Sequence, residues 1–272
     1  MTAAPRQRPP FDLVTAQVSH TAPVSPRMRR ITLTGTQVKG FGAAVGDAIK
    51  LVLAGPGQWR PPTALWGPEG LSYLGGTPAL RAYSISRVDA DAGELDITAL
   101  THGRGPGSRW AAAARPGDTV QFVGPRRDYL GTTGADLLLV AGDETAVWVA
   151  AGILAELPAG QRAHVVLEVA DERDAQPLPD RDGATVTWLY RGDRPAGGGL
   201  LEAGVRAVPW PTGRVQAWVA AEAGEVRRIR AYLRGERGLD RASLTTFGYW
   251  REGLTSTQLD EAAAAGEEID ER

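Results

Sequence analysis

Two polar stretches in the first half of the sequence combine residues that suit a phosphate-containing ligand. The first is Arg81-Ala-Tyr-Ser-Ile-Ser86, which carries a guanidinium, a phenol and two small hydroxyls within a strand-like run. The second is Thr101-His-Gly-Arg-Gly-Pro-Gly-Ser-Arg-Trp110, which adds hydroxyl, imidazole and cationic groups among glycines. Together they favour an extended, flat ligand with a negatively charged middle. A flavin nucleotide is such a ligand, because it joins a planar ring and a ribityl chain to a pyrophosphate.

Arg81, Tyr83 and Ser84 divide between the two faces of the predicted strand. Successive side chains of a strand point to opposite sides, so Arg81 and Tyr83 share one face and Ser84 lies on the other. In a ligand site, Arg81 would contact a phosphate, Tyr83 a ring, and Ser84 a ring nitrogen or oxygen. The sequence alone also allows an edge strand with an ordinary surface arginine and a half-buried tyrosine.

A short helix is predicted at residues 108–114, where Ser108 is a suitable N-cap, alanines follow, and Pro116-Gly117 ends the helix. Because this helix opens directly after Gly105-Pro106-Gly107, its first backbone N–H groups and the positive end of its dipole favour phosphate binding. The alternative is a helix that only connects two strands. His102, which a glycine follows, is either a ligand contact or a turn residue.

The elements that position these residues begin with a series of short strands. Six segments show polar and apolar residues in alternation and end at Gly, Pro or Asp, as strands do. They are residues 13–20, 30–34, 47–53, 80–88, 94–100 and 119–123. With no long helix between them, they predict a six-stranded antiparallel Greek-key β-barrel. The interval 56–79, rich in Pro, Gly and Trp, is predicted as an ordered loop near a site or as a flap.

After residue 136 the pattern changes to strands that alternate with helices. Residues 137–141 form a continuous apolar run, as expected for a strand covered on both faces. The pattern then predicts further strands at residues 164–170, 185–190, 216–221 and 243–247, and helices at residues 146–157 and 224–237. This alternation is typical of an α/β doubly wound parallel sheet, whose ligand crevice lies beyond the carboxyl ends of the strands.

Polar residues follow several of these strand ends. Gly142-Asp-Glu-Thr145 stands where a dinucleotide pyrophosphate would lie, but its two carboxylates would repel phosphate, so we expect contact through Thr145 and backbone N–H groups. Asp143 can alternatively serve only as a helix cap. Gly248-Tyr-Trp-Arg-Glu-Gly253 places two aromatic rings and a cation at the same edge, where they either contact a ligand or close the core. Three arginines also follow strands, where they could bind a 2′-phosphate: Arg173, Arg191 and Arg194.

Composition narrows the classes of protein. The chain of 272 residues has 43% apolar residues, a formal charge of −2 and no cysteine. It can therefore bury the cores of two ordinary domains, and it lacks the basic surface typical of nucleic-acid binders. Disulfides, thiolate metal sites and iron–sulfur clusters are excluded, and no histidine spacing indicates a metal site. No Gly-x-Ser-x-Gly motif indicates a hydrolase nucleophile.

Targeting and domain boundaries follow from the same reading. No apolar run reaches the length of about 20 residues needed for a membrane span, and the N-terminus lacks the apolar core of a signal peptide. We therefore expect a cytoplasmic protein, without membrane insertion, that acts as a monomer. The predicted parts are a disordered arm at 1–12, the barrel domain at 13–133, the α/β domain at 134–253, and an acidic tail at 254–272.

Taken in order, these motifs resemble the siderophore-interacting protein family of ferric-siderophore reductases, which belongs to the ferredoxin-reductase-like flavoproteins. The Arg-x-Tyr-Ser motif alone is shared by many flavin reductases, whereas its joint occurrence with the later motifs is more specific. The matching stretches are Arg81-Ala-Tyr-Ser84, His102-Gly-Arg-Gly-Pro-Gly-Ser-Arg-Trp-Ala111, Pro116-Gly-Asp118, Gly124-Pro125, Gly142-Asp-Glu-Thr-Ala146, Ala220-Ala-Glu222, residues 226–230, and Gly248-Tyr-Trp-Arg-Glu-Gly253.

The resemblance implies an FAD-binding barrel followed by a domain for NAD(P)H, and the three arginines favour NADPH over NADH. It implies no catalytic side chain, because the flavin carries the chemistry. Cofactor contacts would come from Arg81, Ala82, Tyr83, Ser84, Thr101, His102, Gly103, Gly105 and Ser108 at the barrel, and from Thr145, Glu222, Tyr249 and Trp250 at the second domain. The anionic ferric siderophore would meet basic side chains around the flavin: Lys50, Arg126 or Arg127, and Arg251.

The chain departs from the family pattern at three places. Ser84 stands where the family usually has Thr, Ser86 where it often has Arg, and Val147-Trp148 where it usually has Leu-Pro. The first two bear on the flavin contacts and the third on docking of the electron donor. Two alternative functions stay open: a flavin oxidoreductase of the same fold with another acceptor or a ferredoxin donor, and a ferric-chelate-binding protein without turnover.

Overall fold

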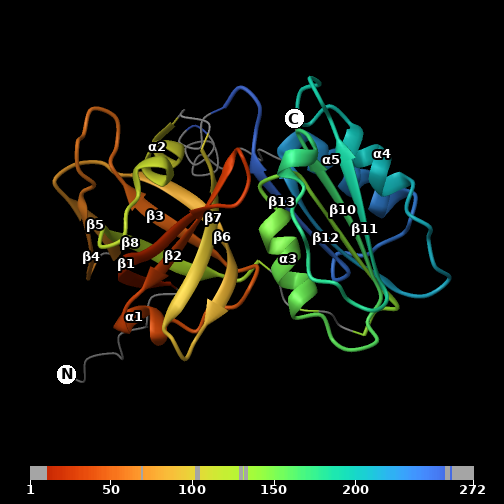
Figure 1. Ribbon diagram of the computed structural model, residues 1–272, viewed down its shortest axis with the longest axis horizontal. Coiled ribbons are helices and arrows are strands. Elements are labelled where there is room, and N and C mark those ends of the chain that lie inside the picture. The colour runs from red at the N-terminus through yellow and green to blue at the C-terminus, as the bar shows by residue number, and fades with distance from the viewer. Residues whose placement is uncertain are drawn as a thin grey trace, which may run out of the picture.

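A computed structural model describes residues 11–68, 70–101, 105–128, 131, 134–254 and 258. Its two large sheets lie side by side, a closed barrel from the N-terminal half and a parallel sheet from the C-terminal half (Figure 1). The predicted fold, a six-stranded antiparallel barrel followed by a doubly wound parallel sheet, is confirmed. Most of the predicted N-terminal arm and acidic tail lies outside the described residues.

The barrel is a closed ring in the order β1-β2-β7-β6-β3-β8. Its strands are β1 (Asp12–Pro23), β2 (Met28–Thr34), β3 (Ala48–Leu53), β6 (Ala79–Asp89), β7 (Glu94–Leu100) and β8 (Thr119–Arg126). Alternate apolar side chains of these strands point inward and are fully buried, among them Ile31, Leu51 and Phe122. Two helices accompany the barrel, α1 (Thr36–Lys39) and α2 (Gly105–Ala113). Because the ring is closed, every barrel strand is hydrogen-bonded along both edges. The apolar side chains that alternate to the inner face therefore enclose a core.

The interval 56–79, predicted as an ordered loop near a site or as a flap, is not a loop throughout. This interval contains a hairpin of two antiparallel strands, β4 (Thr63–Gly67) and β5 (Gly70–Leu74). The Gln121 side chain of β8 anchors the hairpin, because it accepts a hydrogen bond from Ala64 N at 2.8 Å and donates one to Ala64 O at 3.2 Å. This side-chain amide satisfies backbone groups that a neighbouring strand would otherwise bond, so the hairpin forms within a Pro- and Gly-rich stretch.

The second sheet is parallel throughout, in the order β11-β10-β9-β12-β13. Its strands are β9 (Leu137–Gly142), β10 (Ala163–Val169), β11 (Ala184–Tyr190), β12 (Val215–Glu222) and β13 (Leu244–Trp250). The helices are α3 (Val147–Ala155), α4 (Leu200–Arg206) and α5 (Ala223–Gly235), with a short 3-10 turn η1 (Glu172–Asp174). The sequence did not predict α4, which is only seven residues long and follows a glycine-rich turn.

The side chains of alternate residues of β9 point to the two opposite faces of this sheet. Leu137 and Leu139 pack with α4 and α5, whereas Leu138 and Val140 pack with α3. The continuous apolar run that predicted a doubly covered strand is explained by this arrangement. Among the described residues, no helix has the length and apolar character needed to cross a bilayer.

Helix α3 lies between the sheet and the barrel (Figure 1). Gly152 allows this close approach, because a Cβ there would lie 2.7 Å from the Ser86 carbonyl oxygen of β6 and 2.4 Å from a Val45 methyl carbon. Side chains also join the two halves directly. Ser25 donates to the Asp174 carboxylate at 2.8 Å, and Arg27 pairs with both Asp174 and Asp171.

Candidate functional site

The strand pairs place the Arg81 motif as its alternation predicts. Arg81 lies opposite Leu51 and Tyr83 opposite Ile49, both inward-facing residues of β3, whereas Ser84 lies opposite Ala48. Tyr83 packs against the barrel core, and burial raises the pKa of its phenol to about 12. Tyr83 therefore stays a neutral hydroxyl at physiological pH. The exposed Ala82 faces outward opposite Lys50.

The helix beside this motif begins earlier than predicted. Helix α2 starts at Gly105, so Ser108 is buried in its first turn and is not the N-cap. A Cβ at Gly107 would lie 2.5 Å from the Tyr83 hydroxyl oxygen and 3.4 Å from Arg81 Cγ. The contact with Tyr83 is too short for a Cβ, so glycine lets the first turn of α2 come this close to the phenol, whereas the distance to Arg81 is an ordinary contact. No acidic residue stands in that turn, so its N–H groups suit an anion. The Arg81 side chain passes beside the turn, and its Nη1 donates to the Leu80 carbonyl oxygen at 2.7 Å.

Thr101 closes the other end of this region. Its backbone N and Oγ1 both donate to the Arg27 carbonyl oxygen, at 2.8 and 3.1 Å, which holds the end of β7 against the β1–β2 turn. The predicted contacts His102 and Gly103 lie outside the described residues. Thr101 is thus placed at the entrance to the glycine-rich segment, with its hydroxyl bonded inside the protein.

The two halves of the chain meet at Ser84. Its hydroxyl donates to the Tyr249 hydroxyl oxygen of β13 at 2.6 Å, and burial raises the pKa of Tyr249 well above its usual value. Tyr249 stacks on Phe247, with ring centroids 6.3 Å apart, and meets Trp218 edge-on at 6.4 Å. This aromatic group, together with Ser84, suits the edge of a planar ring. The sequence did not indicate a role for Phe247 or Trp218, because each reads as an ordinary apolar strand residue.

The alternative that Asp143 caps the helix is wrong, because the N-cap of α3 is Ala146 and no side chain bonds there. Asp143 is 3% exposed, and its carboxylate accepts hydrogen bonds from Thr145 N at 2.9 Å, Glu222 N at 3.0 Å and Trp250 Nε1 at 2.7 Å. Burial, opposed by these hydrogen bonds, raises its pKa to about 6. Asp143 therefore ties together the carboxyl ends of β9, β12 and β13. The predicted nucleotide contacts Thr145 and Trp250 both engage this carboxylate, and Trp250 closes the edge of the sheet.

The second carboxylate of this turn is neutralised by an arginine. Arg191 donates to both oxygens of Glu144, at 2.6 and 2.5 Å, and lies 3.7 Å from Glu168. The Arg191 and Glu144 side chains are only 11% and 12% exposed. Burial raises the pKa of Glu168 to about 7, although Arg191 opposes this.

These pairings reduce the repulsion that we expected between a pyrophosphate and the two carboxylates of the turn after β9. Asp143 points inward and Glu144 is paired, while the N-terminus of α3 has no side-chain cap and no acid in its first turn. The backbone N–H groups there remain suited to phosphate. Glu222, the other predicted contact, is 7% exposed and its side chain caps α5 by accepting from Glu225 N at 2.9 Å.

The predicted substrate residues divide into two groups: three stand on the strands around the Ser84–Tyr249 contact or directly after them, and one is turned elsewhere. Ala48 pairs with Ser84 on one side and with Arg126 on the other, so Arg126 shares a row with the Ser84–Tyr249 contact. Arg126 lies 5.7 Å from the centroid of Phe247 and bonds both oxygens of Asp128 at 2.6 Å. Lys50 stands two positions along β3, and Arg251 directly follows β13. Arg127 is turned elsewhere, towards Asp47 at 3.0 Å and the Gly42 carbonyl.

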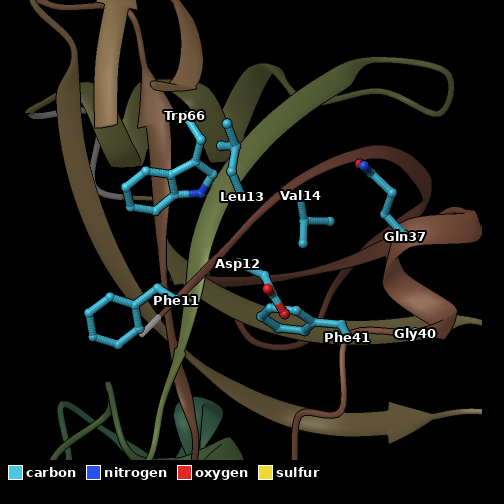
Figure 2. Close-up of a pocket in the computed structure, with 8 residues that line it drawn as sticks. All are labelled: Phe11, Asp12, Leu13, Val14, Gln37, Gly40, Phe41 and Trp66. Atoms are coloured by element: carbon cyan, nitrogen blue, oxygen red, sulfur yellow. The ribbon is translucent and has the colours of Figure 1, made fainter. Parts of the chain in front are cut away.

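An open hollow of about 560 Å³ lies elsewhere on the barrel, between the start of β1, α1 and the hairpin (Figure 2). Aromatic rings dominate its wall, with Trp66 from β4 on one side and Phe41 on the other. None of the predicted cofactor or substrate residues that the structure describes lines it. Its remaining lining residues are Phe11, Asp12, Leu13, Val14, Gln37 and Gly40.

Comparisons with known proteins place these features in one family. The sequence profile described as "Siderophore-interacting FAD-binding domain" matches residues 17–129, and that described as "Siderophore-interacting protein" matches residues 135–253. The ferric vibriobactin reductase ViuB of Vibrio cholerae is 30% identical over 234 residues, which cover 85% of this chain and 86% of that protein.

Solved structures agree with the sequence comparisons. A siderophore utilization protein from T. fusca superposes with a TM-score of 0.82 and 33% identity, covering 90% of this chain and 95% of that one. A ferredoxin reductase of carbazole 1,9a-dioxygenase has a TM-score of 0.67 at 15% identity, with 89% and 70% covered, and so shares the fold alone. The chain therefore belongs to the siderophore-interacting protein family, with its FAD-binding domain and ferredoxin-reductase-like fold.

Proposed function

We propose that this protein is an FAD-dependent ferric-siderophore reductase that takes electrons from NADH or NADPH and releases iron as Fe(II). The observation that carries the proposal is the convergence of two sites on β6. One joins Arg81 to the glycine-opened start of α2, and the other joins Ser84 to the aromatic group of β13. The similarity to a ferric vibriobactin reductase supports the same chemistry.

The residues of the barrel fit FAD. Arg81 and the first turn of α2 offer a cation and backbone N–H groups to a pyrophosphate, without a nearby acid in that turn. Ser84 and Tyr249 offer hydroxyls to the polar edge of a planar ring, and Tyr83 contributes a neutral phenol. We assign residues 13–133 to this cofactor. Bound FAD would supply the redox chemistry, accepting a hydride and giving up electrons singly.

The second domain would bind the electron donor. The uncapped start of α3 suits the donor's phosphates, and Thr145 and Glu222 stand at the edge of the sheet where a nicotinamide nucleotide binds in this type of fold. We assign residues 134–253 to the donor. Because β13 carries Tyr249 to Ser84, the donor crevice and the ring edge adjoin each other.

The ferric siderophore would approach from the side on which Lys50, Arg126 and Arg251 lie. Basic groups around this opening attract an anionic chelate and raise its local concentration. Hard oxygen ligands hold Fe(III) more tightly than Fe(II), so one-electron reduction weakens the complex and frees the iron. This reaction requires no general base from the protein.

The test begins with the absorbance spectrum of the purified protein, which should show bound oxidised flavin. Anaerobic addition of NADH or NADPH should bleach it, and a ferric siderophore should restore the colour while a chelator of Fe(II) traps the product. Protein that cannot be loaded with FAD would refute the proposal. Reduced flavin that quinones or dyes reoxidise, but ferric siderophores do not, would assign a different acceptor. Reduction by ferredoxin and by neither nucleotide would reassign the donor.

A further inference from the structure

The order of the parallel sheet locates the donor's adenosine. Numbered along the chain, its strands run 3-2-1-4-5, the arrangement of dinucleotide-binding sheets. In that arrangement the pyrophosphate lies at the turn after the first strand, here β9, and the adenosine ribose lies at the carboxyl end of the second strand, here β10. An acidic residue at that end bonds the ribose hydroxyls of NADH, whereas an arginine accommodates the 2′-phosphate of NADPH.

Asp171 stands at this position, two residues beyond the end of β10. Its Oδ1 accepts from Arg173 N and Arg173 Nε, both at 3.0 Å, and its Oδ2 accepts from Arg173 Nη2 at 2.9 Å and Arg27 Nη2 at 3.2 Å. The Arg173 side chain, foremost among these donors, lowers the pKa of Asp171 well below its usual range. The group is therefore an ionised carboxylate whose backbone contact and barrel contact hold it in place.

This bonding leaves room for a ribose once Arg173 turns aside. The Arg173 side chain is 71% exposed and supplies one bond to each Asp171 oxygen. When it leaves, each oxygen regains one acceptor position, and the 2′- and 3′-hydroxyls of a ribose can donate one bond to each. A 2′-phosphate in the same place would meet a carboxylate with charge of its own sign.

The three arginines that the sequence suggested as ligands of a 2′-phosphate form hydrogen bonds and ion pairs within the protein. Arg191 is largely buried against Glu144 and Glu168, so withdrawing it would leave two carboxylates without their cation. Arg194 bonds the backbone carbonyls of Arg191 and Tyr190, at 3.1 and 3.5 Å. Arg173 pairs with Asp171 itself. The sequence shows these three cations after their strands but cannot show the acceptor that each one holds.

We infer that the donor domain prefers NADH to NADPH and that Asp171 is the residue that selects it, by accepting hydrogen bonds from the adenosine ribose. This inference rests on the proposed function, because it assumes a nicotinamide nucleotide as electron donor. It concerns a different part of the molecule from the flavin site, so the two can fail separately.

Calorimetric titration of the FAD-loaded protein with ADP-ribose and with 2′-phospho-ADP-ribose tests the inference without turnover. ADP-ribose should bind about tenfold more tightly than 2′-phospho-ADP-ribose. In the complex with the phosphorylated ligand, the charged Asp171 acceptor lacks the hydrogen bond from the 2′-hydroxyl. Asp171→Asn should remove most of this preference. The matched control is Asp240→Asn, since Asp240 is also a carboxylate with a lowered pKa that accepts from a turn N–H, but it precedes β13 at the opposite edge of the sheet.

Arg173→Gln distinguishes whether Asp171 or Arg173 is the residue that selects the nucleotide. Under the inference it leaves the preference for ADP-ribose intact or enlarges it. Tighter binding of 2′-phospho-ADP-ribose by the wild type, lost in Arg173→Gln, would make Arg173 the selecting residue and overturn the inference. Failure of both ligands to bind a flavin-loaded protein that still reduces ferric siderophores with another electron donor would also overturn it. The donor part of the proposed function would then fail as well, whereas its flavin-to-iron step would stand.

Discussion

Replacing Asp143 by Asn should change how the stability of this protein depends on pH. Burial, with the neighbouring Glu144 as second cause, raises the pKa of Asp143 from 3.8 to about 6. The folded chain therefore holds this proton more tightly than the unfolded chain does. The resulting stabilisation is fully present below the unfolded pKa of 3.8 and is lost as the pH rises through about 6.

The magnitude follows from the shift and from the hydrogen bonds. A rise from 3.8 to about 6 corresponds to about 3 kcal/mol in the free energy of unfolding. Asn cannot ionise, so the variant lacks this pH-dependent contribution. Its amide can accept on one side only, whereas the carboxylate accepts from Thr145 on one oxygen and from Glu222 and Trp250 on the other. A buried donor left unpaired costs about 1–3 kcal/mol.

Urea unfolding at several pH values between about 4 and 8 measures both effects. Asp143→Asn should be clearly less stable than the wild type near pH 5 and closer to it near pH 7. Glu168, whose pKa burial raises to about 7, titrates in both proteins, but its pKa is raised less in Asp143→Asn because the Asp143 charge contributes to that rise. The control Asp240→Asn should behave oppositely, since a hydrogen bond from Ser243 lowers the pKa of Asp240 and its contribution is lost as the pH falls. Parallel pH profiles for the wild type and Asp143→Asn would refute the reasoning.

Three further substitutions test the flavin and substrate sites. Arg81→Ala should weaken FAD binding by about tenfold or more, since it removes a charge-assisted contact to phosphate; unchanged retention in a fluorescence titration would show that Arg81 is no phosphate ligand. Gly107→Ala should also weaken FAD binding, although alanine favours helices, because its Cβ would lie 2.5 Å from the Tyr83 hydroxyl and force α2 away from it; an unaltered dissociation constant would contradict the close packing. Lys50→Gln should raise the KM for an anionic ferric siderophore, and less so at high salt, whereas Lys39→Gln on α1 should not; equal effects of the two would mean that only net charge matters.

Local patterns were sufficient for most of the fold. Alternation with period two marked the barrel strands, and the apolar run at residues 137–141 marked a strand with both faces covered, because each pattern reports how a strand is buried. The hairpin of β4 and β5 escaped this reasoning. Its strands depend on Gln121, a residue far along the chain, for backbone hydrogen bonds, and its flanking prolines and glycines are typical of a loop.

The candidate site was likewise predictable from the sequence only in part. The faces of Arg81, Tyr83 and Ser84 followed from strand geometry, whereas the meeting of Ser84 with Tyr249 joins residues that are distant in the sequence. The start of α2 at Gly105 was missed because Ser108 suits an N-cap, while packing against Tyr83 favours the earlier glycines.

The sequence by itself determined which chemical groups this protein possesses, the periodicity of its strands and the motifs of its family. Only the tertiary structure decided which of those groups remain available to a ligand. Arg191 and Asp143 look like surface charges beside a strand end, yet one is bound by Glu144 and the other holds the edge of the sheet together. The reason is physical: a charge acts through the partners that surround it, and folding brings those partners from distant parts of the chain.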